Sequence, residues 1–204
     1  MTTQATKKSS VFETKTMAKI AILSAIAFVL MLFEFPVPVA PSFYKLDFSE
    51  VAVMIGGFAL GPIPAVAIEG MKVILNLLFN GTITMGVGEF ANFAIGCAMA
   101  VPAAAIYHRN KTRKSALIGM LVGTLVMTVT GVVLNYLVLI PAYVSLAHFP
   151  MDAIIGMGQA IFPFIKNTFD LVIACVTPFN LIKGVLVSLI TILLYKHVSP
   201  LLHK

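Results

Sequence analysis

The sequence predicts an all-α integral membrane protein that crosses the bilayer six times and keeps both termini in the cytoplasm. First, 59% of its 204 residues are hydrophobic and 11% are charged, and its mean hydropathy of +1.00 lies outside the range of soluble domains. Second, the hydrophobic residues form separate runs suited to helices across a hydrocarbon layer ~30 Å thick, without the alternation of a transmembrane barrel. Third, lysine and arginine collect in alternate connections between these runs.

We expect each of six hydrophobic runs to form one transmembrane helix. The first follows a basic stretch, as in a signal peptide, but Pro38 stands where a small residue should precede cleavage at Ala40, so we expect an uncleaved span. The second reaches only about 20 Å as a helix and must be tilted, shielded by neighbours or extended by the preceding LDFSE. GPIP at 61–64 predicts a tight break before the third. The predicted spans are Met17 to Phe35, Phe48 to Leu60, Ile63 to Phe79, Val87 to Tyr107, Ser115 to Ile140, and a last one ending near Tyr195.

The positions of the cations predict the orientation in the membrane, because short cytoplasmic connections are enriched in lysine and arginine. Only Lys45 and Lys166 lie in the opposite connections, and Lys72 and Lys183 lie within spans. We therefore expect a cytoplasmic tail at 1–16, one six-helix domain at 17–197 and a second cytoplasmic tail at 198–204. Ten of the fourteen cations lie on the predicted cytoplasmic side: Lys7, Lys8, Lys15, Lys19, Arg109, Lys111, Arg113, Lys114, Lys196 and Lys204.

Two connections predicted to face outward are themselves apolar, at 34–47 and 141–177. A solvated loop would be more polar. We expect these segments to fold back as a lid over a cavity that opens outward. Helices lying in the headgroup layer are the alternative.

The last predicted span begins with TPFNLIKG, which places Asn180 and Lys183 on nearly the same helix face. Pro178 either occupies the first helical position, with Thr177 as the cap, or kinks a longer helix that begins near Asn167. A lysine within a span costs roughly 2.5 to 3.5 kcal/mol and persists when a partner or ligand compensates it. The alternative is that Lys183 reaches the outer headgroups.

Further residues could complete a binding site around this polar pair. Asn135 lies in the neighbouring span, and lysine and amide groups together suit a neutral, flat, hydrogen-bonding heterocycle better than an anion, which would call for arginines. Glu89 and Asn92 either line the same cavity or lie at the membrane interface. Aromatic rings that could sandwich a planar ligand are Phe43, Tyr44, Tyr136, Tyr143, Phe162, Phe164 and Phe179.

Other charged residues have structural explanations. Glu69 and Lys72 stand three residues apart in one span and are expected to neutralise one another. Asp47, Ser49 and Glu50 are typical of a helix start, with a cap and an acidic first turn.

No catalytic constellation is present in the sequence. Its four histidines show no spacing typical of a metal site, and its two cysteines, Cys97 and Cys175, are expected to be packing residues. Since the chain has no phosphate-binding loop, we expect no ATPase activity of its own and no cofactor. The first span offers a docking face instead, because small residues let another helix approach closely: Ala18, Ala21 and Ala25.

Five stretches in order resemble one family: PSFYKLDFSEV, FALGPIPAVAIEGMKVIL, GEFANFAIG, VLNYLVLIPAY and TPFNLIKG. The chain resembles the substrate-binding S components of energy-coupling factor (ECF) vitamin importers, specifically the riboflavin-specific member. The resemblance implies the six-helix S-component fold in a prokaryotic cell membrane. It also implies capture of riboflavin from outside and association with a transmembrane coupling protein and two ABC-type ATPases.

The resemblance also implies roles for individual residues. The first outward loop would cap the pocket, bringing Phe43, Tyr44 and Lys45 near the flavin. Asn135, Asn180 and Lys183 would make polar contacts with it, and the alanine face of the first span would dock on the coupling protein. The alternatives are an S component for another vitamin and a self-sufficient secondary carrier of a small heterocycle. Such a carrier usually shows inverted repeats or paired broken helices.

Overall fold

A computed structural model describes residues 13–82, 84–146 and 148–202. Within these ranges, five helical segments are long and apolar enough to cross a membrane. Their bounds confirm the predicted order of hydrophobic spans, although individual limits move. The five segments are α1 (Thr14–Met31), α3 (Pro62–Asn80), α4 (Val87–Arg109), the run Arg113–Ser145 and the run Thr168–Lys196.

The second predicted span is helix α2, which covers Ser49–Leu60. It has 12 residues and packs against α1, α3, α4 and the last helix, α9 (Thr177–Leu202). All its residues except the last, Leu60, are buried, so its neighbours shield it, as expected of a helix too short to span. Gly61, at φ +115°, and Pro62, the first residue of α3, make the break predicted from GPIP.

The predicted end of the first span is wrong. Helix α1 ends at Met31, before the predicted Phe35, because the chain turns there into a small antiparallel hairpin. Its strands are β1 (Phe35–Pro36) and β2 (Lys45–Leu46), with Phe35 opposite Leu46. The last segment that is apolar enough to cross a membrane ends at Lys196, in agreement with the predicted end near Tyr195, although the helix itself continues to Leu202.

Each of the two long runs contains a π-helical segment shortly before a proline. Arg113–Ser145 comprises α5 (Arg113–Leu134), the π-helical η1 (Asn135–Leu139) and α6 (Ile140–Ser145). Pro141 is the second residue of α6, two positions after η1 ends. A proline ring crowds the carbonyl of the preceding turn and leaves it without a donor, and a wider π turn accommodates both effects. The same arrangement recurs at Pro178.

The run around Pro178 decides between the two interpretations of TPFNLIKG. It comprises α8 (Thr168–Leu171), the π-helical η2 (Val172–Val176) and α9. Asn167 caps its start, with Oδ1 accepting from the amide of Asp170 at 2.9 Å. Pro178 therefore lies inside a longer helix that begins next to Asn167, and the prediction of Thr177 as the cap is wrong.

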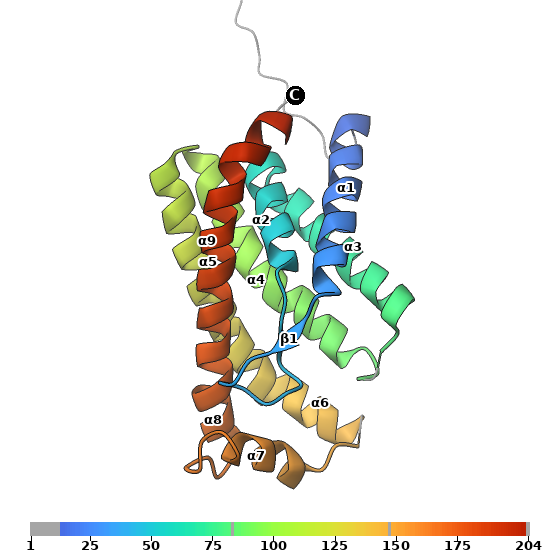
Figure 1. The fold of residues 1–204 in the computed structure, drawn as a ribbon, viewed down its shortest axis with the longest axis vertical. Helices are drawn as coiled ribbons and strands as arrows, with labels where there is room; N and C mark the ends of the chain where they lie inside the picture. The colour runs from blue at the N-terminus through green and yellow to red at the C-terminus, as the bar shows by residue number, and fades with distance from the viewer. Residues whose placement is uncertain (1–12, 83, 147, 203–204) are drawn as a thin grey trace, which may run out of the picture.

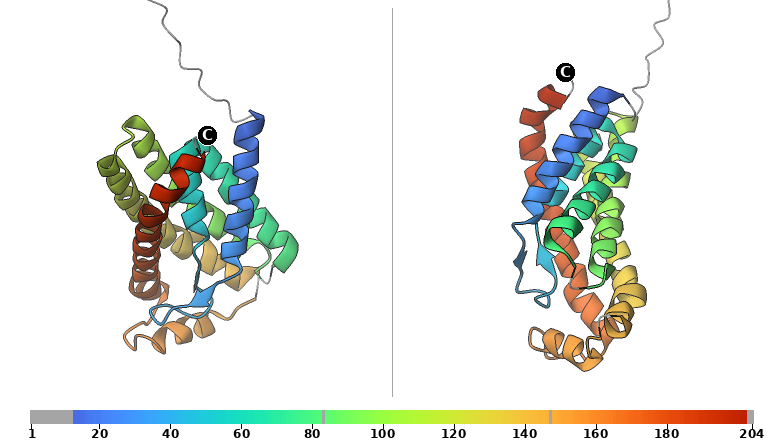
Figure 2. Two further views of the ribbon diagram at one scale, coloured as in Figure 1. Left: turned by 45° about the horizontal axis from the view of Figure 1, so that its top comes forward. Right: turned by 90° about the vertical axis from the view of Figure 1, so that its right-hand side faces the viewer.

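The two ends of the bundle differ in construction. Figure 1 shows the start of α1 and the end of α9 at one end, which we call the termini end, together with the connection between α4 and α5. The hairpin, α6 and the short helix α7 (Met151–Gln159) lie at the other, which we call the cavity end, and Figure 2 shows the same separation from two further sides. Both apolar connections predicted to face outward therefore lie at the same end.

Candidate ligand-binding site

A cavity of about 540 Å³ lies at the cavity end, between the hairpin, α2, α4, α7 and α9. This volume lies within the usual range for small-molecule sites. Its walls come from both apolar connections, as expected of segments folded over a cavity, with Glu34 from the first and Met157 from the second. All eight residues predicted to bind a ligand line it: Phe43, Tyr44, Lys45, Glu89, Asn92, Asn135, Asn180 and Lys183.

The hairpin contributes an aromatic wall. The rings of Phe43 and Tyr44 lie 4.4 Å apart between centroids, and Tyr44 lies 5.7 Å from Phe179 of α9. The Tyr44 hydroxyl donates to Asn135 Oδ1 at 2.6 Å, and burial raises the pKa of Tyr44 well above its ordinary value, so it remains a neutral donor. Lys45 forms a salt bridge with Glu34, which ties the two sides of this loop together.

Gly131 lies beside both asparagines of the cavity. Asn135 Nδ2 donates to the carbonyl of Gly131 at 2.8 Å, and Asn180 Nδ2 donates to the carbonyl of Val176 at 3.0 Å. A Cβ at Gly131 would lie 2.6 Å from Asn180 Nδ2. Glycine at this position therefore lets α5 and α9 hold both amides against the cavity, and each amide keeps a second N–H for another acceptor.

Lys183 belongs to a buried ionic network. Its Nζ donates to Asp47 Oδ2 at 3.1 Å and lies 3.7 Å from Glu50 Oε1. Lys72 Nζ lies 2.9 Å from Glu50 Oε1 and 2.7 Å from Glu69 Oε1, which confirms the predicted pairing of Lys72 with Glu69. Since only 10% of the Lys183 side chain is exposed, it ends on carboxylates within the bundle and not at the surface.

Sequence reasoning missed Asp47 and Glu50 as residues of the site. Glu50 does lie in the first turn of α2, but the cap position belongs to Phe48, one residue from the prediction. Asp47 Oδ1 accepts from the amide of Ser49 at 2.8 Å, while its other oxygen binds Lys183. The sequence did contain a signal for this role. Two lysines within apolar spans require anionic partners, and these two carboxylates lie at the start of the short second span.

Burial alone would raise the pKa of Asp47, but its charged and hydrogen-bonding neighbours together lower this pKa by more. The charges of Lys183 and Lys72, with two hydrogen bonds from Ser49, lower the pKa of Asp47 to about 2. Asp47 is therefore a carboxylate at every physiological pH. It fixes the Lys183 ammonium at the cavity wall.

Glu89 and Asn92 line the cavity from α4, in agreement with the first of the two alternatives predicted for them. Glu89 Oε2 accepts from the hydroxyls of Thr82 at 3.0 Å and Thr84 at 3.2 Å. Asn92 Oδ1 is buried and has no hydrogen-bond donor among the described residues. This end of α4 therefore presents oxygen acceptors to the cavity.

Not every aromatic candidate reaches the cavity. Tyr143 joins Phe43, Tyr44 and Phe179 in lining it. Three others lie elsewhere: Tyr136 packs edge-on against Phe169, and Phe162 packs against Phe164. Sequence gives their proximity to the site but not the direction in which each ring points.

The predicted docking residues lie on a separate surface. Ala18, Ala21 and Ala25 are all exposed on α1, none of them lining the cavity. One face of α1 is therefore exposed in the part of the chain that the structure describes. Its role as a docking face stays a prediction.

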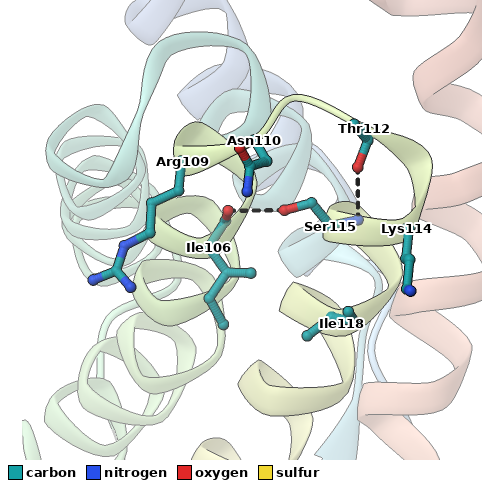
Figure 3. Close-up of a pocket in the computed structure, with 7 residues that line it drawn as sticks. All are labelled: Ile106, Arg109, Asn110, Thr112, Lys114, Ser115 and Ile118. Carbon is teal, nitrogen blue, oxygen red and sulfur yellow. Dashed lines mark hydrogen bonds between the residues drawn. The ribbon is translucent and has the colours of Figure 1, made fainter.

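A second hollow of about 270 Å³ lies at the termini end, where α4 connects to α5. Ser115 closes this connection by donating its hydroxyl to the carbonyl of Ile106 at 2.9 Å, and its amide donates to Thr112 Oγ1 at 3.1 Å. Figure 3 shows Arg109 and Lys114 on opposite sides of the hollow. Because its charged groups do not converge, we assign ligand binding to the larger cavity.

These features define a membrane protein with a polar, aromatic-walled cavity at one end of its helices. A family profile described as the substrate-specific component of ECF transporters matches residues 15–195. The chain therefore belongs to this family, and it is a multi-pass membrane protein.

Named relatives and a solved structure agree with this assignment. The chain is 35% identical over 200 residues to the riboflavin transporter RibU of Staphylococcus aureus, covering 97% of each chain. It is 32% identical over 187 residues to the riboflavin transporter FmnP of Bacillus subtilis, covering 91% of this chain and 93% of that one. A solved structure of the S component of a bacterial ECF transporter matches with a TM-score of 0.71 and 35% identity, over 92% of this chain and 97% of that one.

Proposed function

We propose that this protein is the riboflavin-binding membrane subunit of an ATP-driven ECF vitamin importer. One observation carries the proposal: eight residues chosen from sequence, which come from four separate stretches of the chain, line one cavity of about 540 Å³. The similarity to relatives named riboflavin transporters supports riboflavin over other vitamins.

The cavity has the chemistry that a flavin requires. The isoalloxazine ring is flat and carries donors and acceptors along its pyrimidine edge, which Asn135, Asn180 and Lys183 would contact. Phe43 and Tyr44 would pack against the ring, since planar aromatic systems favour offset stacking and tilted contacts. Tyr143 and Phe179 supply apolar surface for the dimethylbenzene side.

The proposal includes a direction of capture. The distribution of lysine and arginine favours a cytoplasmic termini end, so the cavity would open outward from a prokaryotic plasma membrane. Six crossings then follow if α2, buried among four other helices, counts as the short second span.

The chain would depend on partners for energy. We expect a transmembrane coupling protein and two ABC-type ATPases, with the coupling protein docking on the exposed alanine face of α1. Ala21→Trp and Ala25→Trp should leave riboflavin affinity unchanged and abolish uptake by cells that contain the whole transporter. Normal uptake with either variant would count against this face.

The ligand can be identified directly. Purified protein should be yellow, and mass spectrometry of the released ligand should give riboflavin, with quenching of added riboflavin fluorescence at one equivalent. Release of a different vitamin, with no quenching by riboflavin, would overturn the assignment. Uptake by the lone chain in vesicles without ATPases would instead indicate a self-sufficient carrier.

A further inference from the structure

Two buried carboxyl groups, those of Glu50 and Glu69, lie within hydrogen-bonding reach of one another. Glu50 lines the cavity from α2, whereas Glu69 belongs to α3 and does not line it. Both face one ammonium group, since Lys72 Nζ is 2.9 Å from Glu50 Oε1 and 2.7 Å from Glu69 Oε1. The side chains of Glu50 and Glu69 are 2% and 0% exposed, so bulk water does not screen one from the other.

The second oxygen of each carboxyl group lacks a hydrogen-bond donor. Glu50 Oε2 and Glu69 Oε2 are buried, and neither has a partner among the described residues. A buried acceptor without a donor is costly. An ionised carboxylate accepts hydrogen bonds but donates none, so two carboxyl groups in contact satisfy each other only when one of them carries a proton. These two neighbouring acceptors therefore indicate one proton between them.

The charges around the pair agree with this count. If every group of the buried ionic network were ionised, three negative charges would face two positive ones, and an excess charge within a membrane is costly. One proton makes the network neutral. Carboxylates in direct contact share a proton for the same reason in other proteins. The members of the network are Asp47, Glu50, Glu69, Lys72 and Lys183.

A metal cation fits this place less well than a proton. Cations that prefer oxygen need about six ligands around one point, whereas the Lys72 ammonium already occupies the position between the two Oε1 atoms. Helix α4 closes another side, because a Cβ at Gly96 would lie 3.0 Å from Glu69 Oε2. In the part of the chain that the structure describes, no three acidic, histidine or cysteine side chains are arranged to hold a metal ion.

We propose that Glu50 and Glu69 hold one proton between them and that Glu69 is the acid. The Glu69 hydroxyl donates to Glu50 Oε2, and its carbonyl oxygen accepts from Lys72. Glu50 is the ionised partner because it faces a second ammonium group, that of Lys183 at 3.7 Å. The predicted pairing of Glu69 with Lys72 is thereby kept as a hydrogen bond to a charged donor.

The shared proton makes Glu69 a positioning residue for the cavity wall. It holds the Glu50 carboxylate in place between Lys72 and Lys183, and Lys183 lines the cavity. An ionised Glu69 would repel Glu50 toward the cavity and disturb this arrangement. This consequence rests on the proposed function, whereas the proton itself can be tested without any ligand.

The direct test is infrared spectroscopy of the purified full chain at neutral pH, in a detergent without ester groups. The wild-type chain should show the C=O stretch of a protonated carboxylic acid, and Glu69→Gln should lack it. Asp152→Asn, which removes an exposed carboxylate outside the cavity, is the control and should keep the band. If the difference spectrum between wild type and Glu69→Gln shows loss of an ionised carboxylate instead, the proposal is wrong.

Glu50→Gln tests whether the proton is shared. The new amide N–H can donate to Glu69 Oε2, so Glu69 no longer needs a proton and can ionise against Lys72. The acid band should therefore disappear although Glu69 is still present. A band that persists in Glu50→Gln would mean that burial alone keeps Glu69 protonated, and the sharing would be wrong. Should Glu50→Gln not fold, the comparison of wild type with Glu69→Gln still decides whether Glu69 is an acid.

A pair of substitutions at Glu69 tests the positioning role. Glu69→Gln keeps an oxygen for Lys72 and an N–H for Glu50, as the neutral acid does, whereas Glu69→Leu offers neither. Glu69→Gln should melt within a few degrees of wild type, and Glu69→Leu should melt lower. In Glu69→Leu the affinity for riboflavin should fall by about fivefold or more, the loss expected from one hydrogen bond, and in Glu69→Gln by much less. Equal losses in the two variants would contradict the neutral acid.

The remaining outcomes separate this inference from its competitors. A melting temperature of the wild-type chain that depends on sodium when sodium chloride replaces choline chloride, with no acid band, would show that a cation balances the network and would overturn the proton. If the acid band is present and the chain binds no riboflavin, the proposed function fails and the shared proton stands. If the chain binds riboflavin and has no acid band, the proposed function stands and the shared proton is wrong.

Discussion

Glycines of the same two helices serve different purposes at the two ends of the bundle. At the termini end, Gly119 and Gly123 of α5 face the backbone of α4: a Cβ at these positions would lie 2.7 Å from the carbonyl oxygen of Ala103 and 2.4 Å from that of Met99. At the cavity end, Gly131 of α5 faces the amide of Asn180. Glycine lets a neighbouring backbone approach closely at the termini end and lets a polar side chain approach closely at the cavity end.

The same contrast appears in α4. Gly96 faces Glu69, whose carboxylate oxygen lies 2.3 Å from where a Cβ would stand. In lipid, helices gain little from the hydrophobic effect and associate through close packing of small residues, as they do at the termini end. Polar groups buried at the cavity end lose their contact with water, and this cost can exceed what their pairing returns. The contrast indicates that close helix packing stabilises the termini end, whereas the cavity end keeps polar groups that suit a ligand.

The largest effect is expected from a side chain inserted at the termini end. Gly123→Val would place atoms against the Met99 carbonyl, and a backbone cannot move aside as a flexible side chain can. We expect no folded protein in detergent, measured by size-exclusion chromatography. Gly156→Ala is the matched control, because a Cβ there meets nothing within 4 Å, and it should behave as wild type. A monodisperse Gly123→Val with normal melting would remove the distinction between the two ends.

The next largest effect concerns Lys183 at the cavity end. Lys183→Met leaves the buried Asp47 carboxylate without its ammonium partner, which costs about 3–5 kcal/mol of stability, and it removes a proposed ligand contact. The double variant Lys183→Met/Asp47→Asn removes both charges and should recover most of the stability. Riboflavin affinity should stay at least about tenfold below wild type in both variants.

Melting curves and fluorescence titrations of the two variants separate the two roles of Lys183. If affinity recovers together with stability in the double variant, then Lys183 acts only through the fold.

A smaller effect is expected at Gly131. Gly131→Ala places a methyl group 2.6 Å from Asn180 Nδ2, and the amide can move aside because it is the end of a side chain. Stability should change little, while riboflavin affinity should fall by roughly tenfold because a misplaced amide loses its hydrogen bond. In a double-mutant cycle with Asn180→Leu, Gly131→Ala should add no further loss. Additive losses would show that Gly131 does not act through Asn180.

Much of this architecture could be predicted from the sequence, because membrane spans depend on local composition. Hydropathy located every long helix, and the charge pairing of Lys72 with Glu69 followed from their spacing in one helix. Five of the eight candidate site residues are polar groups within apolar spans, where they have few places to go, and all five reached the cavity: Glu89, Asn92, Asn135, Asn180 and Lys183.

Features that depend on contacts between distant segments could not be predicted from the sequence. The π turn before Pro178 depends on how a whole helix absorbs a proline, and the hairpin at Phe35 depends on pairing with Leu46. Asp47 and Glu50 already had a local explanation as a helix start, which concealed their long-range partner, Lys183. A residue whose local role already explains its presence, such as Asp47, can have a second, long-range role that becomes visible only in the folded structure.

The smallest expected effect is a pH dependence of stability that arises at the cavity end. The pKa of Asp47, lowered from 3.8 to about 2, means that this carboxylate stabilises the fold at every pH above about 4, by on the order of 2 kcal/mol, and that the contribution is lost as the pH falls toward 2. The difference in melting temperature between wild type and Asp47→Asn should therefore stay constant from about pH 8 to about pH 5 and shrink only in stronger acid. Asp152→Asn, which removes an exposed carboxylate outside the cavity, is the control for loss of an acidic side chain. A difference that already declines between pH 7 and pH 5 would mean that Asp47 is not held by Lys183 and Lys72, and the ionic network at the cavity end would need a different arrangement.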